Sequence, residues 1–136
     1  MVRDTCLCLA VHRAARALGR RFDDALRPLD LTNGQFSLLM SLNRPKPPSI
    51  APVAELLAMD RTTLTAALKP LERRGLVKIT LDAADRRGRL LRLTPKGRRL
   101  LAAAVPIWQL HHRRLEKQLG PTAGLHEKLA AMAGCS

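Results

Sequence analysis

Two clusters of side chains have the types and spacing needed to bind a nucleic acid. In the first, short hydroxyl side chains stand among basic ones; its members are Arg61, Thr62, Thr63, Thr65, Lys69 and Arg73. Threonine hydroxyls can reach base edges or phosphates with little loss of side-chain entropy. The second cluster consists of Arg86, Arg87 and Arg89. Guanidinium groups so close together could enter a narrow minor groove, where the negative potential is strongest.

The net charge of the chain agrees with an anionic partner. Lys and Arg number 24 against 11 Asp and Glu, which gives a formal net charge of +13. A surplus of this size predicts a polyanionic partner, and nucleic acid is the first candidate. Two plainer interpretations stay open: a basic surface that serves solubility alone, and threonines that only cap and solvate their helix.

No motif in the sequence predicts an enzyme. The chain has no G-x-S-x-G, no glycine-rich phosphate loop and no H-E-x-x-H, and its carboxylates form no pair outside charged helix faces. It also lacks a run of about 18 apolar residues that could span a bilayer, and residues 1–10 lack the basic-then-apolar order of a secretory signal. We therefore expect a cytoplasmic binding protein with no cofactor and no membrane partner.

The elements that must hold the two clusters are predicted to be mostly helical. With 136 residues, 46% of them apolar and only 2% aromatic, the chain predicts one domain with a core of Leu, Ala, Val and Ile. Apolar residues recur at three- and four-residue steps through residues 5–29, which predicts one long helix. Thr32 predicts the start of a second helix. That helix would carry inward Phe36, Leu39, Met40 and Leu42.

A short helix, a tight turn, another helix and a strand hairpin are predicted after a rigid loop at residues 43–49, which holds three prolines. Ser49 and Asp60 are good N-caps for the two helices, and Thr94 for a long helix after the hairpin. The helix that Asp60 caps is predicted over residues 61–74. The two strands are predicted over 76–81 and 89–93, and a last short helix over 123–133. This order is that of a winged helix-turn-helix, so the expected fold is mainly α with a small β wing.

The residues around the second strand resemble the MarR family of transcriptional regulators. The family pattern D-x-R-x5-L-T-x-x-G is matched by Asp85, Arg87, Leu93, Thr94 and Gly97. The resemblance extends through D-R-T-T-L-T at residues 60–65 and L-E-R-R-G-L-V at residues 71–77. It covers about residues 5–120 of the chain.

This resemblance implies a homodimer that binds double-stranded DNA at a pseudo-palindromic operator. The chain would form a single domain over residues 1–136. Dimerisation helices would cover about 5–29 and 95–133, and a winged helix-turn-helix would cover about 32–94. The implied function is that of a sequence-specific transcriptional regulator, a repressor released by a small aromatic ligand or by thiol oxidation. The alternative is an architectural protein that binds nucleic acid with little regard to sequence.

The resemblance also assigns roles to single residues. Residues 61–74 would be the recognition helix, Arg87 would enter the minor groove, and Asp85 would pair with the wing arginines. The sequence departs from the pattern of such proteins at Ala66 and Ala67, where an arginine and a polar residue are common, and at Ile79, where an arginine is common. Base readout is therefore expected to depend on the threonines and Arg61, with phosphate attraction supplying most of the affinity.

Three cysteines suggest a redox sensor. Cys6 and Cys8 lie at the start of the first long helix, and Cys135 lies one residue from the C-terminus. Residues two apart on a helix point about 200° apart, so a bond between subunits is the more reasonable disulfide. The alternative is that the cysteines are small apolar packing residues. Cys8 and His12 could also be two metal ligands, but a site would need further donors from Cys6, His111 or His112, and we expect no metal.

Relatives in the MarR family often bind small aromatic effectors between the dimerisation helices and the winged lobe. The corresponding pocket would be lined here by His12, Arg16, Phe36, Met40 and Trp108. The alternative interpretation is that these residues belong to the ordinary core, with Trp108 packing along a helix seam.

Overall fold

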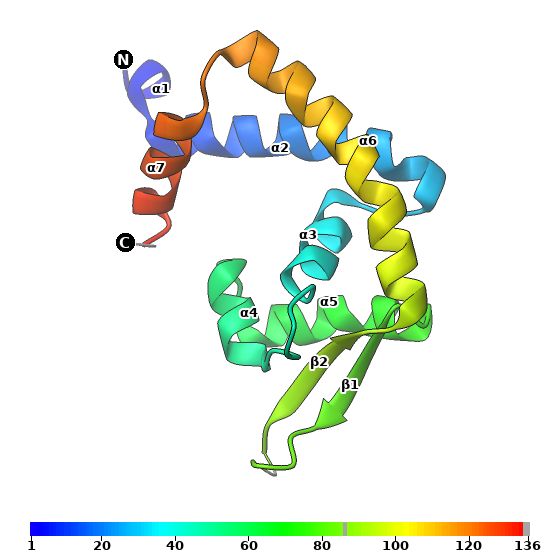
Figure 1. The fold of residues 1–136 in the computed structure, drawn as a ribbon. Coiled ribbons are helices and arrows are strands. Elements are labelled where there is room, and N and C mark those ends of the chain that lie inside the picture. Colours follow the sequence, from blue (N-terminus) through cyan, green and yellow to red (C-terminus); the bar gives the residue numbers. More distant parts are fainter. Residues whose placement is uncertain (86, 135–136) are drawn as a thin grey trace.

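The computed structural model describes residues 1–85 and 87–134. The chain forms helices and one two-stranded antiparallel sheet, as Figure 1 shows. The elements are α1 (Val2–Thr5), α2 (Leu7–Leu26), a 3-10 turn η1 (Arg27–Leu29), α3 (Asn33–Ser41), α4 (Ile50–Leu56), α5 (Arg61–Arg73), β1 (Val77–Leu81), β2 (Arg89–Leu93), α6 (Pro95–Leu119) and α7 (Ala123–Met132). The predicted fold class, mainly α with a small β wing, is confirmed.

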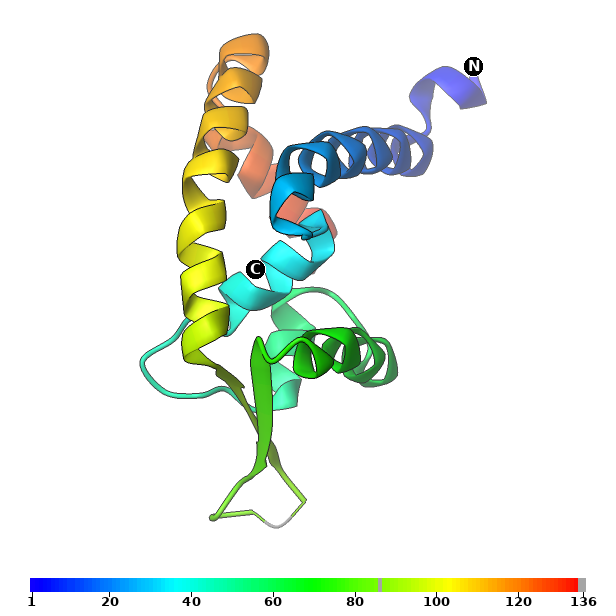
Figure 2. The same ribbon diagram turned by 90° about the vertical axis from the view of Figure 1, so that its right-hand side faces the viewer.

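Helix α2 and the hairpin lie at opposite ends of the molecule, and α6 runs from the hairpin to the end where α2 lies. Helices α2 and α6 cross and contact each other, and both contact α3. Below them α3, α4 and α5 form a lobe from which the β1–β2 hairpin projects (Figures 1 and 2). No helix within the described residues is both long enough and apolar enough to cross a membrane.

Side-chain caps fix the starts of three helices at the predicted residues. The Thr32 hydroxyl accepts a hydrogen bond from the backbone N–H of Gln35, and the Gln35 side chain accepts one from the backbone N–H of Thr32. The Asp60 carboxylate accepts from the backbone N–H of Thr63 at the start of α5, and the Thr94 hydroxyl accepts from that of Gly97 at the start of α6, without a reciprocal bond. Each cap satisfies a backbone N–H that the first helical turn leaves unpaired, so these boundaries follow from local chemistry.

The core is built almost entirely from leucine and valine. Its most deeply buried side chains are Leu26, Leu39, Leu64, Leu68, Leu71, Leu76, Leu91, Val53 and Val77. The prediction that Met40 points inward is wrong, because its side chain is 47% exposed. Helix α3 instead buries Leu38 and Leu39, and Met40 follows about 100° further round the helix, on the solvent side.

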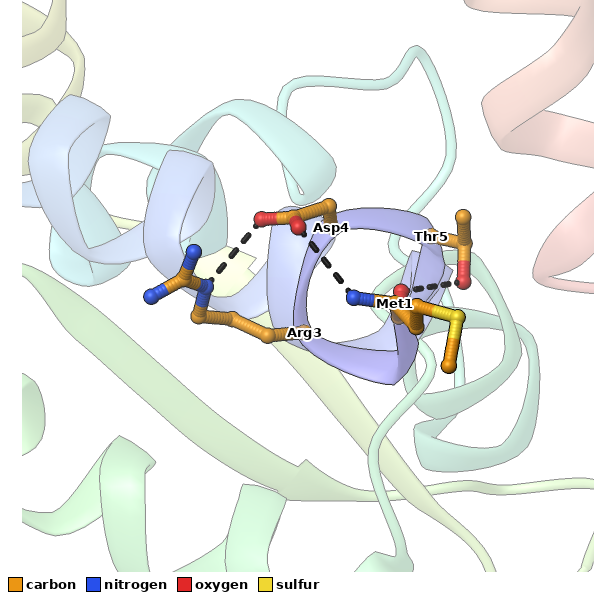
Figure 3. A network of polar contacts seen from close by, with 4 residues as sticks. All are labelled: Met1, Arg3, Asp4 and Thr5. Atoms are coloured by element: carbon orange, nitrogen blue, oxygen red, sulfur yellow. Dashed lines mark hydrogen bonds and ion pairs between the residues drawn. The ribbon is translucent and has the colours of Figure 1, made fainter.

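The predicted continuous first helix is interrupted at Cys6. Helix α1 ends at Thr5, and Cys6 is extended with φ −75° and ψ 108° before α2 begins. Polar contacts within the first turn hold α1 as a separate unit (Figure 3). The Met1 amino group pairs with Asp4, and the Thr5 hydroxyl donates to the Met1 carbonyl. At the other end, α2 gives way to the 3-10 turn η1, which contains Pro28.

Asp23 joins α2 to the start of α3. Its carboxylate accepts hydrogen bonds from the backbone N–H of Asn33 at 2.7 Å and from the Asn33 side-chain amide at 2.8 Å. These bonds, the backbone one first, hold the pKa of Asp23 below its ordinary value. The link ties the winged lobe to the long helices at a fixed point.

The loop at residues 43–49, which we call the proline loop, pairs with the hairpin in a way that the sequence did not predict. Strands β1 and β2 pair from Val77 with Leu93 to Leu81 with Arg89. On the free edge of β2, Ser49 forms an isolated bridge with Leu90, and the backbone N–H of Leu91 donates to the Pro48 carbonyl at 2.9 Å. Strand β2 is therefore held on both edges, by β1 and by the proline loop.

Candidate nucleic-acid interface

A tight turn joins α4 to α5. Ala58 adopts a left-handed conformation with φ 52°, and the backbone N–H of Met59 donates to the Ala54 carbonyl at 2.9 Å. Helix α4 buries Val53 and Ala54 and contacts α5. This short helix and turn set the direction in which α5 leaves the lobe.

Helix α5 has a clear division between a buried face and an exposed face. Leu64, Leu68 and Leu71 are fully buried. All six α5 residues that the sequence predicted for DNA contact are exposed: Arg61, Thr62, Thr63, Thr65, Lys69 and Arg73. At about 100° per residue, the side opposite the leucines carries a stripe that we call the threonine stripe, formed by Thr62, Thr65, Ala66, Lys69 and Arg73. Arg61 and Thr63 flank it.

The three threonine hydroxyls differ in what they can still bind. The Thr65 hydroxyl donates to the Arg61 carbonyl at 2.7 Å, so only its acceptor positions remain for a base or a water. The backbone N–H of Thr63 donates to the Asp60 carboxylate at 2.7 Å, and this bond is the main cause that holds the pKa of that carboxyl below its ordinary value. Thr63 thus takes part in the cap through its main chain, and the residue stays exposed. Within the described residues the Thr62 hydroxyl makes no hydrogen bond.

We predict that Asp60 stabilises α5 through its charge. Because its pKa is lowered in the folded protein, this stabilisation is present above the ordinary aspartate pKa of about 3.9 and is lost as the pH falls through the lower, folded value. Asp60→Ala should lower the melting temperature at pH 7, and its difference from the wild type should shrink towards pH 2. Asp60→Asn is the control, because it keeps a capping oxygen without a titrating charge. If Asp60→Ala lowers the melting temperature by the same amount at pH 7 and at pH 2, this account is contradicted.

The tip of the wing is shaped by two aspartates that bond to the backbone. Asp82 accepts from the backbone N–H of Ala84 at 2.9 Å, and Asp85 accepts from that of Arg87 at 3.0 Å. The predicted pairing of Asp85 with wing arginine side chains is not what the described residues show, since the carboxylate binds the main chain of Arg87. Arg87 and Arg89 are exposed. Arg86, which was also predicted to contact DNA, lies outside the described residues.

Helix α5 and the wing lie at the same end of the molecule, remote from α2 (Figures 1 and 2). The C-terminal end of α5 is held by residues that the sequence analysis missed. The Arg74 guanidinium donates to the Asp30 carbonyl at 2.7 Å, and the Lys96 ammonium donates to the Arg74 carbonyl at 2.8 Å. These bonds join residues far apart in the sequence, so no local pattern could have indicated them.

Comparisons with known proteins agree with this geometry. A family model described as the MarR family matches residues 31–88. The HTH-type transcriptional regulator TtmR of Methylorubrum extorquens is 38% identical over 97 residues, which cover 71% of this chain and 50% of the relative. The organic hydroperoxide resistance transcriptional regulator of Bacillus subtilis is 30% identical over 74% of this chain and 69% of the relative. The chain thus spans about half the length of the first of these relatives.

Two solved structures cover nearly the whole chain. The M. tuberculosis transcriptional regulator MOSR, solved in complex with DNA, has a TM-score of 0.87 and 36% identity over 95% of this chain and 94% of its own. The transcriptional repressor CouR, bound to a 23-mer DNA duplex, has a TM-score of 0.86 and 33% identity over 97% of this chain and 95% of its own. The chain belongs to the MarR family. The resemblance inferred from its wing motif is confirmed.

The cysteines of this MarR-family chain lie at the break between α1 and α2. Cys6 is half-buried, and its sulfur accepts a hydrogen bond from the backbone N–H of Leu9 at 3.5 Å. Cys8 is exposed, with its sulfur 3.9 Å from Nδ1 of His12. Because Cys6 is extended, the helical geometry used to argue against a bond between Cys6 and Cys8 does not apply. Cys135 lies outside the described residues. Within those residues no three His, Cys, Asp or Glu side chains gather as a metal site would require.

The residues predicted to line an effector pocket in this MarR-family chain are only partly brought together. The Phe36 and Trp108 rings stack with centroids 6.3 Å apart, and Trp108 stacks on His112 at 4.6 Å. Met40, His12 and Arg16 are exposed, and Arg16 lines a shallow hollow along α2 that contains none of the aromatic residues. Within one protomer Phe36 and Trp108 therefore act as packing residues, and the pocket stays a prediction.

Proposed function

We propose that this chain is a homodimeric transcriptional regulator that binds double-stranded DNA at a pseudo-palindromic site. Helix α5 would enter the major groove and the wing the neighbouring minor groove, with contacts from the threonine stripe, Arg61, Thr63 and the wing residues Asp85, Arg86, Arg87 and Arg89. The observation that carries the proposal is that the exposed stripe of α5 and the arginine-tipped wing lie at one end of the same lobe. MOSR and CouR, which share the fold over almost their whole length, were both solved with DNA.

The dimer is supported by apolar side chains that one protomer leaves in water. Helices α2, α6 and α7 expose Leu7, Leu9, Leu18, Leu110, Leu119, Leu125, Leu129 and Met132. Apolar side chains concentrated in this way mark an interaction surface. A second copy of the chain would cover them, with residues 5–29 and 95–133 as dimerisation helices and 32–94 as the DNA-binding lobe of a single domain. Two lobes related by a two-fold axis match the halves of a pseudo-palindrome.

Footprinting on the DNA upstream of the protein's own coding sequence, followed by competition with random DNA at physiological salt, tests the proposal. A regulator should keep at least about a thousandfold preference for one site. An architectural binder should be displaced equally by random DNA, since its attraction is to phosphate alone. Equal displacement would refute sequence-specific regulation.

We further propose that the protein is a cytoplasmic repressor and that its release responds to oxidation of Cys6 and Cys8. The support is the exposed Cys8 thiol beside His12 and the similarity to a regulator named for organic hydroperoxide resistance. In the reaction two thiols would lose two electrons and two protons to form a disulfide, while the peroxide O–O bond is reduced. Release by a small aromatic ligand is the second candidate, favoured by the stacked Phe36 and Trp108 and by CouR, which was also solved with p-coumaroyl-CoA.

The thiol proposal predicts a specific response to peroxide. One equivalent of organic peroxide should release the DNA and give a covalent dimer on non-reducing gels. The Cys6→Ser, Cys8→Ser double variant should stay bound, and a Cys135→Ser variant tests the third thiol separately. A double variant that is released as readily as the wild type would rule out Cys6 and Cys8 as the sensor.

A further inference from the structure

The outer face of the wing is basic and takes no part in the interface proposed above. Lys78 and Arg92 are direct partners in the β1–β2 register, and both are exposed. Residues directly opposite each other project from the same face of a sheet. The other face carries Val77, Leu91 and Leu93, which are buried. Like charges directly opposite each other destabilise a sheet, so this pair has a cost in the free protein.

No acidic side chain among the described residues compensates this pair. The ion pairs found there involve the carboxylates of Asp4, Asp24, Asp30 and Glu116, none of which contacts Lys78 or Arg92. Two cations that project side by side without a paired carboxylate raise the local positive potential, which attracts an external anion. The pair therefore indicates an anionic partner for this face.

Arg44 and Arg98 extend the positive charge beyond the strands. With Arg92 they line a hollow of about 80 Å³ between the proline loop, β2 and the first turns of α6. Nε of Arg44 donates to the Ser41 carbonyl at 3.0 Å, which fixes the direction of that side chain. We call Lys78, Arg92, Arg44 and Arg98 the outer basic face.

The outer basic face lies beside the path of a bound duplex. In Figure 2 the wing stands between α5 on one side and the proline loop on the other. In the proposed binding mode, a duplex that lies against α5 and receives the wing tip in its minor groove would continue past the wing, on the side of the proline loop. The cations of this face are set back from the tip, so the flanking duplex would reach them by bending towards the protein. The cost of such bending can be offset by new phosphate contacts.

We infer that the outer basic face binds the phosphates of DNA that flanks the recognised site, an inference that rests on the proposed function. DNA carries one negative charge for about every 1.7 Å of its axis, so one face with four cations can be matched within a single turn of duplex. These phosphate contacts do not distinguish one base pair from another. They extend the binding site outward and increase its dependence on salt.

The test compares two duplexes that contain the footprinted site. The short duplex ends at the base pairs under the two wing tips, and the long duplex adds about 10 base pairs, one helical turn, at each end. Titrations over a range of salt concentrations give the ratio of the two affinities. The wild type should bind the long duplex more tightly, with a salt slope steeper by about 0.9 for each added phosphate contact. The Lys78→Gln, Arg92→Gln double variant should lose most of this gain and bind the short duplex normally.

A charge-preserving control separates charge from shape. The Lys78→Arg, Arg92→Lys exchange should keep the gain, because phosphate attraction depends mainly on charge. The glutamine variant should melt no lower than the wild type, because it removes a repulsive pair. Equal affinity of the wild type for both duplexes would overturn the inference and leave the proposed function standing. If the glutamine variant still binds the long duplex more tightly than the short one, the inference is also overturned. An acidic protein would then be the remaining candidate partner for the outer basic face. Failure to prefer the site over random DNA would refute both.

Discussion

Arg87→Ala is expected to weaken binding to the operator by at least about 30-fold. Loss of one arginine contact to DNA typically costs about 1–3 kcal/mol, and a dimer presents two wings, so the smallest expected loss is about 2 kcal/mol. The Arg87 side chain is exposed, and the Asp85 carboxylate holds its backbone N–H in the turn at 3.0 Å. The residue is thus positioned by its main chain, while its guanidinium projects from the wing. Equilibrium titration of the footprinted duplex measures the effect.

The matched control removes the same charge at the other end of the molecule. Arg3 is exposed in α1, remote from the wing (Figure 1), and Arg3→Ala should change the affinity far less. Sedimentation should show the same dimer for both variants, since Arg87 lies outside the exposed apolar surface. Unchanged DNA binding by Arg87→Ala would refute the assignment of the wing.

The order of elements could be predicted because its determinants are local. Thr32, Asp60 and Thr94 each act within three residues of the helix they start. The leucines of α5 repeat at the helical period, so the same pattern that predicted the helix also predicted its exposed face. For this reason every predicted contact residue of α5 is exposed.

The features that could not be predicted depend on residues distant in sequence or on the second protomer. The pairing of the proline loop with β2 and the bond from Arg74 to Asp30 join segments that no periodicity relates. The exposure of Met40 depends on which side of α3 the long helices cover. The effector pocket would need both protomers, because a single chain stacks Phe36 on Trp108 but leaves His12, Arg16 and Met40 exposed.

Asp85 shows the difference between finding a residue and assigning its role. The resemblance implied that Asp85 pairs with the wing arginine side chains, and within the described residues its carboxylate accepts a hydrogen bond from the backbone of Arg87. A carboxylate followed closely by a turn often binds the main chain two residues on, and that local rule would have predicted the observed contact.

The glycine of the wing motif leads to the largest expected effect on stability. Gly97 is buried in the first turn of α6, where a Cβ would lie 2.1 Å from the carbonyl oxygen of Leu76. Real contacts of this kind do not come so close, and the opposing atom is backbone that cannot rotate away. Gly97→Ala must therefore push α6 off the start of the wing. The helix propensity gained by alanine, about 1 kcal/mol, is too small to offset the displacement.

We expect Gly97→Ala to lose about 3 kcal/mol or more, which corresponds to a melting temperature lower by about 10 °C. DNA binding should fall as well, because Leu76 leads directly into β1 and fixes the base of the wing. Gly34→Ala is the matched control: this glycine is exposed in the first turn of α3, where a Cβ would come no closer than 3.9 Å to the Thr32 hydroxyl, so alanine should leave the melting temperature unchanged or raise it. Equal melting temperatures for Gly97→Ala and the wild type would mean that α6 and the wing are not packed as closely as the Gly97 position requires.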